Sequence, residues 1–110
     1  MPKRGDVAWL DLDPRAGHEQ AGRRPALVLS PQPYNEKTGL AVVCPLTNTR
    51  KGYPFEIRAP IGKRPSVVLA DHVKSVDWVA RRAELLGALP AEIVDQVAAT
   101  IAALIGAGPL

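Results

Sequence analysis

The densest group of reactive side chains lies in a polar segment between two apolar runs, over residues 13–25. It combines an imidazole, a carboxylate, an amide and two guanidinium groups, which belong to His18, Glu19, Gln20, Arg23 and Arg24. Transphosphorylation of RNA needs such a set: a base for the ribose 2′-OH proton, cations for the phosphorane-like transition state, and an acid for the leaving 5′-oxygen. Because the 2′-OH is the internal nucleophile, this chemistry requires no metal-activated water.

Each of these residues also has a plainer interpretation. The planar fork of Arg24 suits phosphate oxygens, and its place at the start of a predicted strand would fix it. It could equally be a surface arginine paired with Glu19 or an aspartate. Glu19 is a candidate base or an arginine-orienting carboxylate, and otherwise a solvated loop residue. His18 can serve as acid or base near neutral pH, or be simply structural. Arg23 and Gln20 are candidate supporting RNA contacts.

A second candidate cluster follows a continuous apolar run, at residues 47–51. The hydroxyl of Thr47 would stand at the mouth of a rigid strand, where it can donate a hydrogen bond to a phosphate oxygen. Asn48, Arg50 and Lys51 would add polar and electrostatic contacts to RNA. The alternative is an ordinary turn, because Thr and Asn are common turn residues at strand ends.

The sequence argues against a metal site, a cofactor-binding motif and a membrane-spanning segment. It has no phosphate-cradling Gly-rich loop before a helix, and neither H-E-x-x-H nor G-x-S-x-G occurs. One cysteine, Cys44, and two histidines are too few for an ordinary zinc site. The single cysteine, the charged N-terminus and the lack of an apolar run of about 20 residues predict a cytoplasmic protein without a membrane span.

The charge is distributed unevenly along the chain. All 14 Lys and Arg lie within residues 1–82, together with 8 of the 11 acidic residues, so this part carries +6 and residues 83–110 carry −3. A basic body with an acidic tail is typical of proteins that bind polyanions. A solvated basic surface would give the same charge, so charge alone does not decide.

The elements that must position these residues are short strands followed by one helix. The 110 residues fit a single domain, residues 1–110. Alternation, apolar runs and turn residues predict strands over 7–12, 24–30, 40–46, 53–58, 66–69 and 73–79, at the spacing of an antiparallel barrel or sandwich. Pro90 is expected as the first residue of an amphipathic helix that packs on the sheet and ends near Gly106. Trp9 and Trp78 could stack on bases, although core or dimer contacts explain them more simply.

Several blocks of the sequence resemble toxins of the MazF/PemK family. The resemblance is carried by Gly5-Asp6-Val7-Ala8-Trp9-Leu10, by Gly17-His18-Glu19-Gln20-Ala21-Gly22-Arg23-Arg24-Pro25, by Pro45-Leu46-Thr47, by Lys51-Gly52-Tyr53-Pro54-Phe55-Glu56 and by Leu69-Ala70-Asp71-His72-Val73-Lys74-Ser75. It extends over about residues 4 to 105, and the first long block followed by K-G-Y-P-F-E is highly specific.

The resemblance implies a mainly β (α+β) fold, an SH3-like barrel of antiparallel strands with a C-terminal helix, as in the toxin CcdB. It also implies a homodimer that cleaves single-stranded RNA without a cofactor, leaving 2′,3′-cyclic phosphate and 5′-OH ends. The family's principal catalytic pair falls on Arg24 and Thr47, with Glu19 as an accessory group and His18 relevant in some branches. The usual partner is an antitoxin whose acidic, disordered tail wraps the toxin groove.

Two positions depart from patterns seen in the family. Leu69 stands where some branches have an arginine that acts together with the residue at Asp71, so Asp71 is expected to be structural here. His72 stands where many members have Gln. Two other functions remain open from the sequence: a non-catalytic inhibitor of a protein target such as gyrase, and an RNA-binding module that has lost catalysis. The pairing of Arg24 with Thr47 in a basic groove favours the nuclease.

Overall fold

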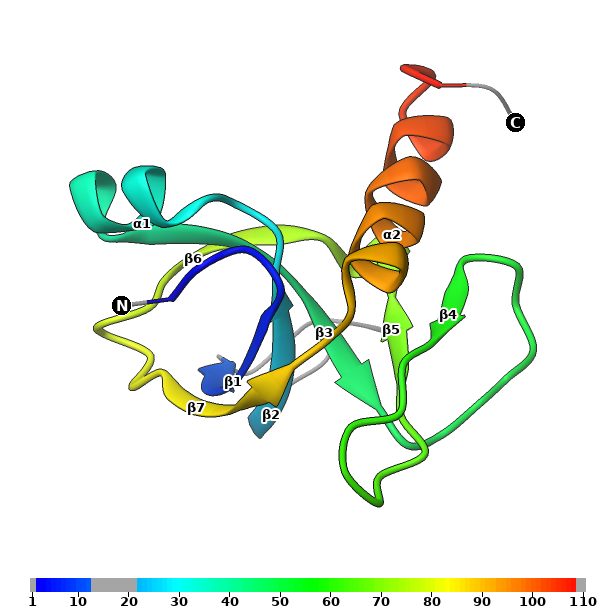
Figure 1. Cartoon of the computed structure of the whole chain (residues 1–110), viewed down its shortest axis with the longest axis horizontal. Helices are drawn as coiled ribbons and strands as arrows, with labels where there is room; N and C mark the ends of the chain where they lie inside the picture. Colours follow the sequence, from blue (N-terminus) through cyan, green and yellow to red (C-terminus); the bar gives the residue numbers. More distant parts are fainter. Residues whose placement is uncertain (1, 13–21, 109–110) are drawn as a thin grey trace.

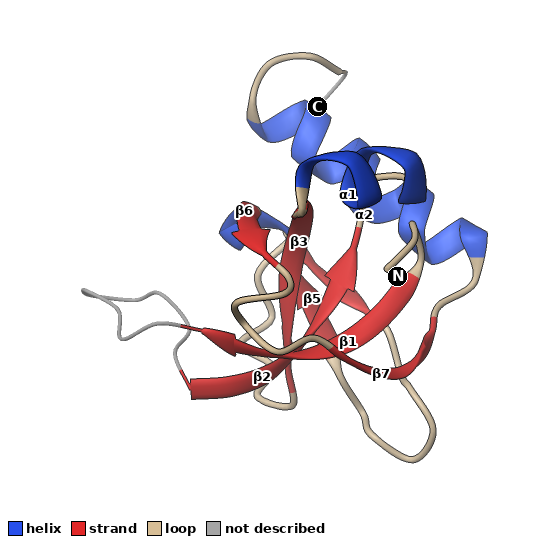
Figure 2. Cartoon of the chain, turned by 90° about the vertical axis from the view of Figure 1, so that its left-hand side faces the viewer, coloured by secondary structure: helices blue, strands red, loops and turns tan. Residues whose placement is uncertain are grey.

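A computed structural model describes residues 2–12 and 22–108 and contains an antiparallel sheet with two α-helices (Figures 1 and 2). The elements run in the order β1 (Asp6–Leu12), β2 (Gly22–Val28), α1 (Gln32–Thr38), β3 (Leu40–Thr47), β4 (Glu56–Arg58), β5 (Val67–Leu69), the 3₁₀ turn η1 (Ala70–His72), β6 (Lys74–Asp77), β7 (Glu84–Ala88) and α2 (Ala91–Leu104). The expectation of a mainly β, antiparallel architecture with a C-terminal helix is confirmed.

The strands are paired in the order β4-β5-β3-β2-β1-β7, and β6 also pairs with β3. The first half of β3, residues 40–43, pairs with β6, residues 43–45 pair with β2, and the last two residues pair with β5. β3 therefore connects the main sheet to the small β3-β5-β4 sheet. Among the described residues this path does not close on itself, so the barrel expected from the sequence is open between β4 and β7.

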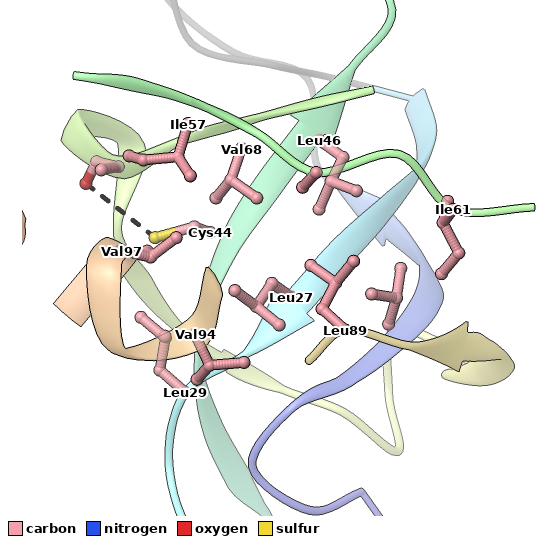
Figure 3. Close-up of a cluster of buried hydrophobic side chains, with 13 residues drawn as sticks. Leu27, Leu29, Cys44, Leu46, Ile57, Ile61, Val68, Leu89, Val94 and Val97 are labelled. Atoms are coloured by element: carbon pink, nitrogen blue, oxygen red, sulfur yellow. Dashed lines mark hydrogen bonds between the residues drawn. The ribbon is translucent and has the colours of Figure 1, made fainter. Parts of the chain in front are cut away.

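Hydrophobic side chains alternate between two cores on opposite faces of the sheet. In β2, Leu27 belongs to one core, whereas Ala26 and Val28 belong to the other, as the period of two in a strand requires. The first core lies between the sheet and α2, where Val94 and Val97 pack onto it (Figure 3). The second core is closed by β6, and Trp78 packs against it.

Several element boundaries differ from those expected. Pro90 is the cap before α2 rather than its first residue, because its backbone is extended with ψ 152°. The expected strand over 53–58 is reduced to β4, since residues 53–56 form a turn closed by a bond from the Glu56 N–H to the Tyr53 carbonyl, 3.1 Å. The strand over 84–88 was not predicted at all. The turn at 61–64 packs against it, and a Cβ at Gly87 would come within 2.8 Å of Ile61 Cδ1.

Candidate active site

The strand register separates a polar face from an apolar face in the small sheet. Residues directly opposite one another in an antiparallel pair point to the same side. On the apolar side, Leu46 pairs with Val68 and Val68 with Ile57, and all three belong to the core beneath α2. On the other side, Thr47 and Arg58 both pair with Val67, and Glu56 pairs with Leu69. The polar residues of this sheet therefore lie on the face turned away from α2.

A groove of about 580 Å³ lies on this polar face. It is lined by Arg24, Thr47, Thr49, Lys51, Tyr53, Phe55, Glu56, Leu69, Asp71 and His72. Three of the residues predicted from the sequence, Arg24, Thr47 and Lys51, therefore lie in one site. The other predicted residues of the first loop, His18, Glu19 and Gln20, lie outside the described residues.

Arg24 and Thr47 are brought together by the pairing of β2 with β3. In the register of these strands, Ala26 pairs with Pro45 and Leu27 with Cys44. The recorded pairs end at Ala26 and Pro45, two residues from Arg24 and from Thr47. Both side chains line the same groove, so they can act on one ligand. The pair is thus carried by two central strands of the sheet rather than by loops.

The hydroxyl of Thr47 is oriented by its own turn. Its Oγ1 accepts a hydrogen bond from the backbone N–H of Thr49, 3.2 Å. A threonine hydroxyl has one hydrogen to donate and two lone pairs that accept. Because this contact uses a lone pair, the hydroxyl hydrogen can still be donated to an oxygen of a ligand in the groove.

Glu56 fixes the segment that carries Lys51. Its carboxylate accepts hydrogen bonds from the backbone N–H of Lys51, at 3.1 and 3.2 Å, and from that of Gly52, at 3.0 Å. Gly52 has a φ of 80°, a conformation that glycine adopts without strain. Glu56 therefore shapes the wall of the groove, and the ammonium group of Lys51 contributes positive charge to it.

An aromatic pair forms another part of the groove wall. The rings of Tyr53 and Phe55 are stacked, with centroids 5.2 Å apart and planes inclined by 24°. Tyr53 is 51% exposed, so part of its side chain is open to solvent. Exposed aromatic rings beside cationic groups are suited to stacking with nucleic-acid bases. Neither ring was assigned a role from the sequence, although both residues belong to the K-G-Y-P-F-E block.

Asp71 and His72 complete the groove from η1. The Nε2 atom of His72 lies 3.9 Å from Oδ1 of Asp71, an ion pair when the imidazole is protonated. Asp71, for which the sequence predicts a structural role, lines the groove together with Arg24 and Thr47. His72 is the one histidine in the part of the chain that the structure describes.

Arg23 lies on the opposite side of β2 from Arg24. Its guanidinium group contacts Asp11 at 2.9 Å and Glu84 at 3.1 Å. Asp11 is also bound by Arg82, and hydrogen bonds from Arg82 and then Arg23 lower the pKa of Asp11 to about 2. Arg23 is therefore committed to an ion-pair cluster, and the structure does not bring it to the groove.

Asn48 and Arg50 also lie outside the groove lining. The hydroxyl of Ser66 donates a hydrogen bond to Oδ1 of Asn48, 3.1 Å. Asn48 is thereby tied to a residue on the apolar side of the sheet, as its position next to Thr47 in the chain requires. Arg50 is exposed in the connection after β3. RNA contacts by Arg23, Asn48 and Arg50 stay predictions.

The described residues gather no cluster of three or more His, Cys, Asp or Glu side chains that could hold a metal ion. None of the described helices is long and apolar enough to cross a membrane.

Residues 3–105 match the model of the family described as PemK-like, MazF-like toxin of type II toxin-antitoxin system. The chain therefore belongs to this family. It is 48% identical over 106 residues to the endoribonuclease toxin MazF of Escherichia coli K12, with 96% of each chain covered. It is 34% identical over 109 residues to the endoribonuclease toxin ChpB of the same strain, and this alignment covers 94% of this chain and 93% of ChpB.

Solved structures agree with this assignment. The crystal structure of MazF (Form-I) from Deinococcus radiodurans superposes with a TM-score of 0.90 at 51% identity, covering 96% of both chains. A chain of the MazE-MazF complex (Form-II) from the same organism superposes with a TM-score of 0.84 at 51% identity, again with 96% of both chains covered.

Proposed function

We propose that this chain is the toxin of a toxin–antitoxin system and a sequence-selective endoribonuclease that cuts single-stranded RNA without a metal ion. The products would carry 2′,3′-cyclic phosphate and 5′-OH ends. The observation that carries the proposal is the groove in which Arg24 and Thr47 meet on neighbouring strands, with Lys51 beside them. The relatives named as endoribonucleases, which align over nearly the whole chain, support it.

In this mechanism the groove binds the scissile phosphate and stabilises the charge that develops on it. Arg24 supplies a bidentate cation and is a candidate general acid, and Thr47 donates its hydroxyl hydrogen to a phosphate oxygen. Lys51 adds positive charge, and the exposed ring of Tyr53 offers a surface for a neighbouring base. Glu19 is the proposed base, with His18 and Gln20 as supporting contacts from the first loop. Glu56 is instead assigned to positioning, because its carboxylate is bonded to the turn at 51–52.

Incubation of the purified protein with a long RNA in excess EDTA tests this function. We expect discrete cuts whose positions share a short sequence and whose ends resist 5′-end labelling by ligation but accept it after phosphorylation. Loss of cutting in EDTA with recovery in Mg²⁺ would contradict the metal-independent mechanism. Absence of cutting under all conditions would leave the two other functions, inhibition of a protein target or RNA binding without catalysis.

We also propose a cognate antitoxin whose acidic, disordered tail occupies the same groove. The basic charge of residues 1–82 and the cations of the groove are complementary to such a segment. The structures of MazE-MazF complexes from Deinococcus radiodurans support an antitoxin partner. In a competition assay, saturating acidic peptide should displace a non-cleavable RNA, and simultaneous binding of both would rule out a shared groove.

A homodimer is proposed on the basis of the family and of apolar side chains left on the surface. Val79, Leu85, Leu104 and Ile105 are between 51% and 72% exposed, and a second copy could cover some of them. Analytical ultracentrifugation should give twice the monomer mass, and a monomer at all concentrations would contradict the proposal.

The cytoplasm is the proposed compartment, since the chain has a single cysteine, which is buried.

A further inference from the structure

We propose that Arg58 on β4 is a further RNA-binding residue, which holds a phosphate other than the one that is cleaved. The proposal rests on the proposed nuclease function and extends its binding site beyond the groove lining. Arg58 carries none of the features that marked the candidate residues in the sequence, and its place is evident only from the strand pairing.

The position of Arg58 follows from the registers of two strand pairs. Thr47 of β3 pairs with Val67 of β5, and Val67 pairs with Arg58 of β4. The three residues therefore form one row on the same side of the small sheet, in which Val67 is buried and Thr47 and Arg58 flank it. Neighbouring strands are about 4.8 Å apart, so Arg58 stands about 10 Å from Thr47 along this row. Arg24 lines the groove together with Thr47, so guanidinium groups lie on both sides of the sheet segment that carries Thr47 and Val67.

The backbone that carries Arg58 is well anchored. Its neighbours in the chain, Ile57 and Ala59, are 3% and 0% exposed, so both are held in the core beneath α2. The backbone N–H of Ala59 also donates a hydrogen bond to the carbonyl of Ser66, 2.9 Å. The side chain of Arg58 therefore leaves a fixed point on the opposite face, as an arginine that serves as a positioned ligand must.

The guanidinium group of Arg58 is available to bind an external anion. Among the described residues no ion pair or hydrogen bond of its side chain is found, and the residue is exposed. The acidic residue on the same strand and face is Glu56, whose carboxylate is bonded to the backbone of Lys51 and Gly52. An RNA strand bound at Arg24 and Thr47 that continued across the small sheet would pass Arg58. The guanidinium group of Arg58 could then bind a phosphate that flanks the cleaved one.

A charged residue on an edge strand has a second explanation. It can prevent the edge from pairing with another sheet, and β4 is at the end of the sheet order. That role requires a charge but no contact with RNA. The two explanations predict different responses to removal of a single phosphate charge from the RNA, which the following experiment measures.

The experiment compares the wild type with Arg58→Gln and with a matched control, Lys37→Gln. Lys37 is an exposed cation on α1, which lies at the opposite end of the molecule from β4 (Figure 1). The ligand is a single-stranded RNA that contains the mapped cut sequence, with 2′-deoxyribose at the cut position. Its dissociation constant is measured at a low salt concentration and at one four times higher, and again with each phosphate in turn replaced by an uncharged methylphosphonate.

We expect Arg58→Gln to weaken binding and to reduce the slope of log K against log salt by about 0.7, the value for one phosphate contact on a single strand. Over this roughly fourfold range of salt, wild-type affinity should thus fall about 2.6-fold more than that of the variant. Replacement of one flanking phosphate should weaken the wild type and Lys37→Gln but leave Arg58→Gln unaffected.

An unchanged slope in Arg58→Gln, or equal sensitivity of variant and wild type to every phosphate replacement, would overturn the proposal. Failure of the proposed function is distinguishable, because in that case the wild type itself would not cut the parent RNA. Circular dichroism and thermal melting of Arg58→Gln should match the wild type, since the side chain is exposed.

Discussion

Arg24 on β2 and Thr47 on β3 line one groove from neighbouring strands, each two residues beyond the last recorded pair of these strands, Ala26 with Pro45. Both residues adjoin buried positions of their own strands, with Pro25 and Ala26 after Arg24 and Leu46 before Thr47. The site is thus preorganised by the same pairing that builds the core. A substitution at either position can change the chemistry of the groove without removing a core contact.

Arg24→Ala and Thr47→Ala should each reduce the rate of RNA cleavage on the order of 10²–10³-fold, the usual cost of one transition-state donor. Arg24→Lys should recover only part of the rate, because a single ammonium cannot replace a bidentate fork. Single-turnover kinetics with a defined RNA measures these effects, and thermal melting checks that the fold is kept. Near-normal cleavage by Arg24→Ala would remove Arg24 from the catalytic assignment.

The Asp11 cluster should make stability depend on pH in the acid range. Arg82 and then Arg23 lower the pKa of Asp11 from 3.8 to about 2 in the folded protein. A lowered folded-state pKa contributes stability that is present above about pH 3.8 and is lost as the pH falls towards about 2. Asp11→Asn should therefore melt below the wild type at about pH 7, and the difference should shrink between about pH 4 and 2. A difference that stays constant over this range would contradict the ion-pair explanation.

The thiol of Cys44 should be inert in the folded protein. Cys44 is buried beneath α2, and burial, with a smaller contribution from the charge of Asp71, raises the pKa of its thiol to about 12. The reactive species is the thiolate, whose fraction at about pH 8 would be on the order of 10⁻⁴. Iodoacetamide at this pH should label the protein quickly in denaturant and very slowly without it. Rapid labelling of the native protein would mean that the core around Cys44 opens readily.

Arg24 and Thr47 could be predicted from the sequence, because their residue types and their positions at strand ends were enough to mark them as candidate phosphate-binding residues. Thr47 directly follows a long apolar run, which marks the end of a buried strand, and Arg24 precedes Pro25 at the start of another. Whether Arg23 or Arg24 faces the groove depends on the register of β2, which the sequence does not specify. In the structure Arg23 forms ion pairs with Asp11 and with Glu84, the latter 61 residues away along the chain.

Other features required the tertiary structure. Tyr53, Asp71 and His72 reach the groove through the β3-β5-β4 pairing, a long-range arrangement without a local signal. The strand β7 was missed because Glu84-Leu85-Leu86-Gly87-Ala88 lacks the alternation of a half-buried strand. Its pairing with β1, and the close approach of Ile61 to Gly87, determine its conformation instead.

The most direct test of the central claim replaces one 2′-hydroxyl group of the RNA substrate with hydrogen. In the proposed mechanism the 2′-OH at the cut position is the nucleophile, and Arg24 and Thr47 stabilise the phosphate that it attacks. An RNA with a single 2′-deoxyribose at that position should bind with nearly unchanged affinity and should not be cut there, whereas the all-ribose RNA yields a 2′,3′-cyclic phosphate detectable by mass spectrometry. Efficient cleavage of the deoxy-substituted RNA at the same bond would show that water or a protein group is the nucleophile, and would contradict the mechanism proposed for the groove.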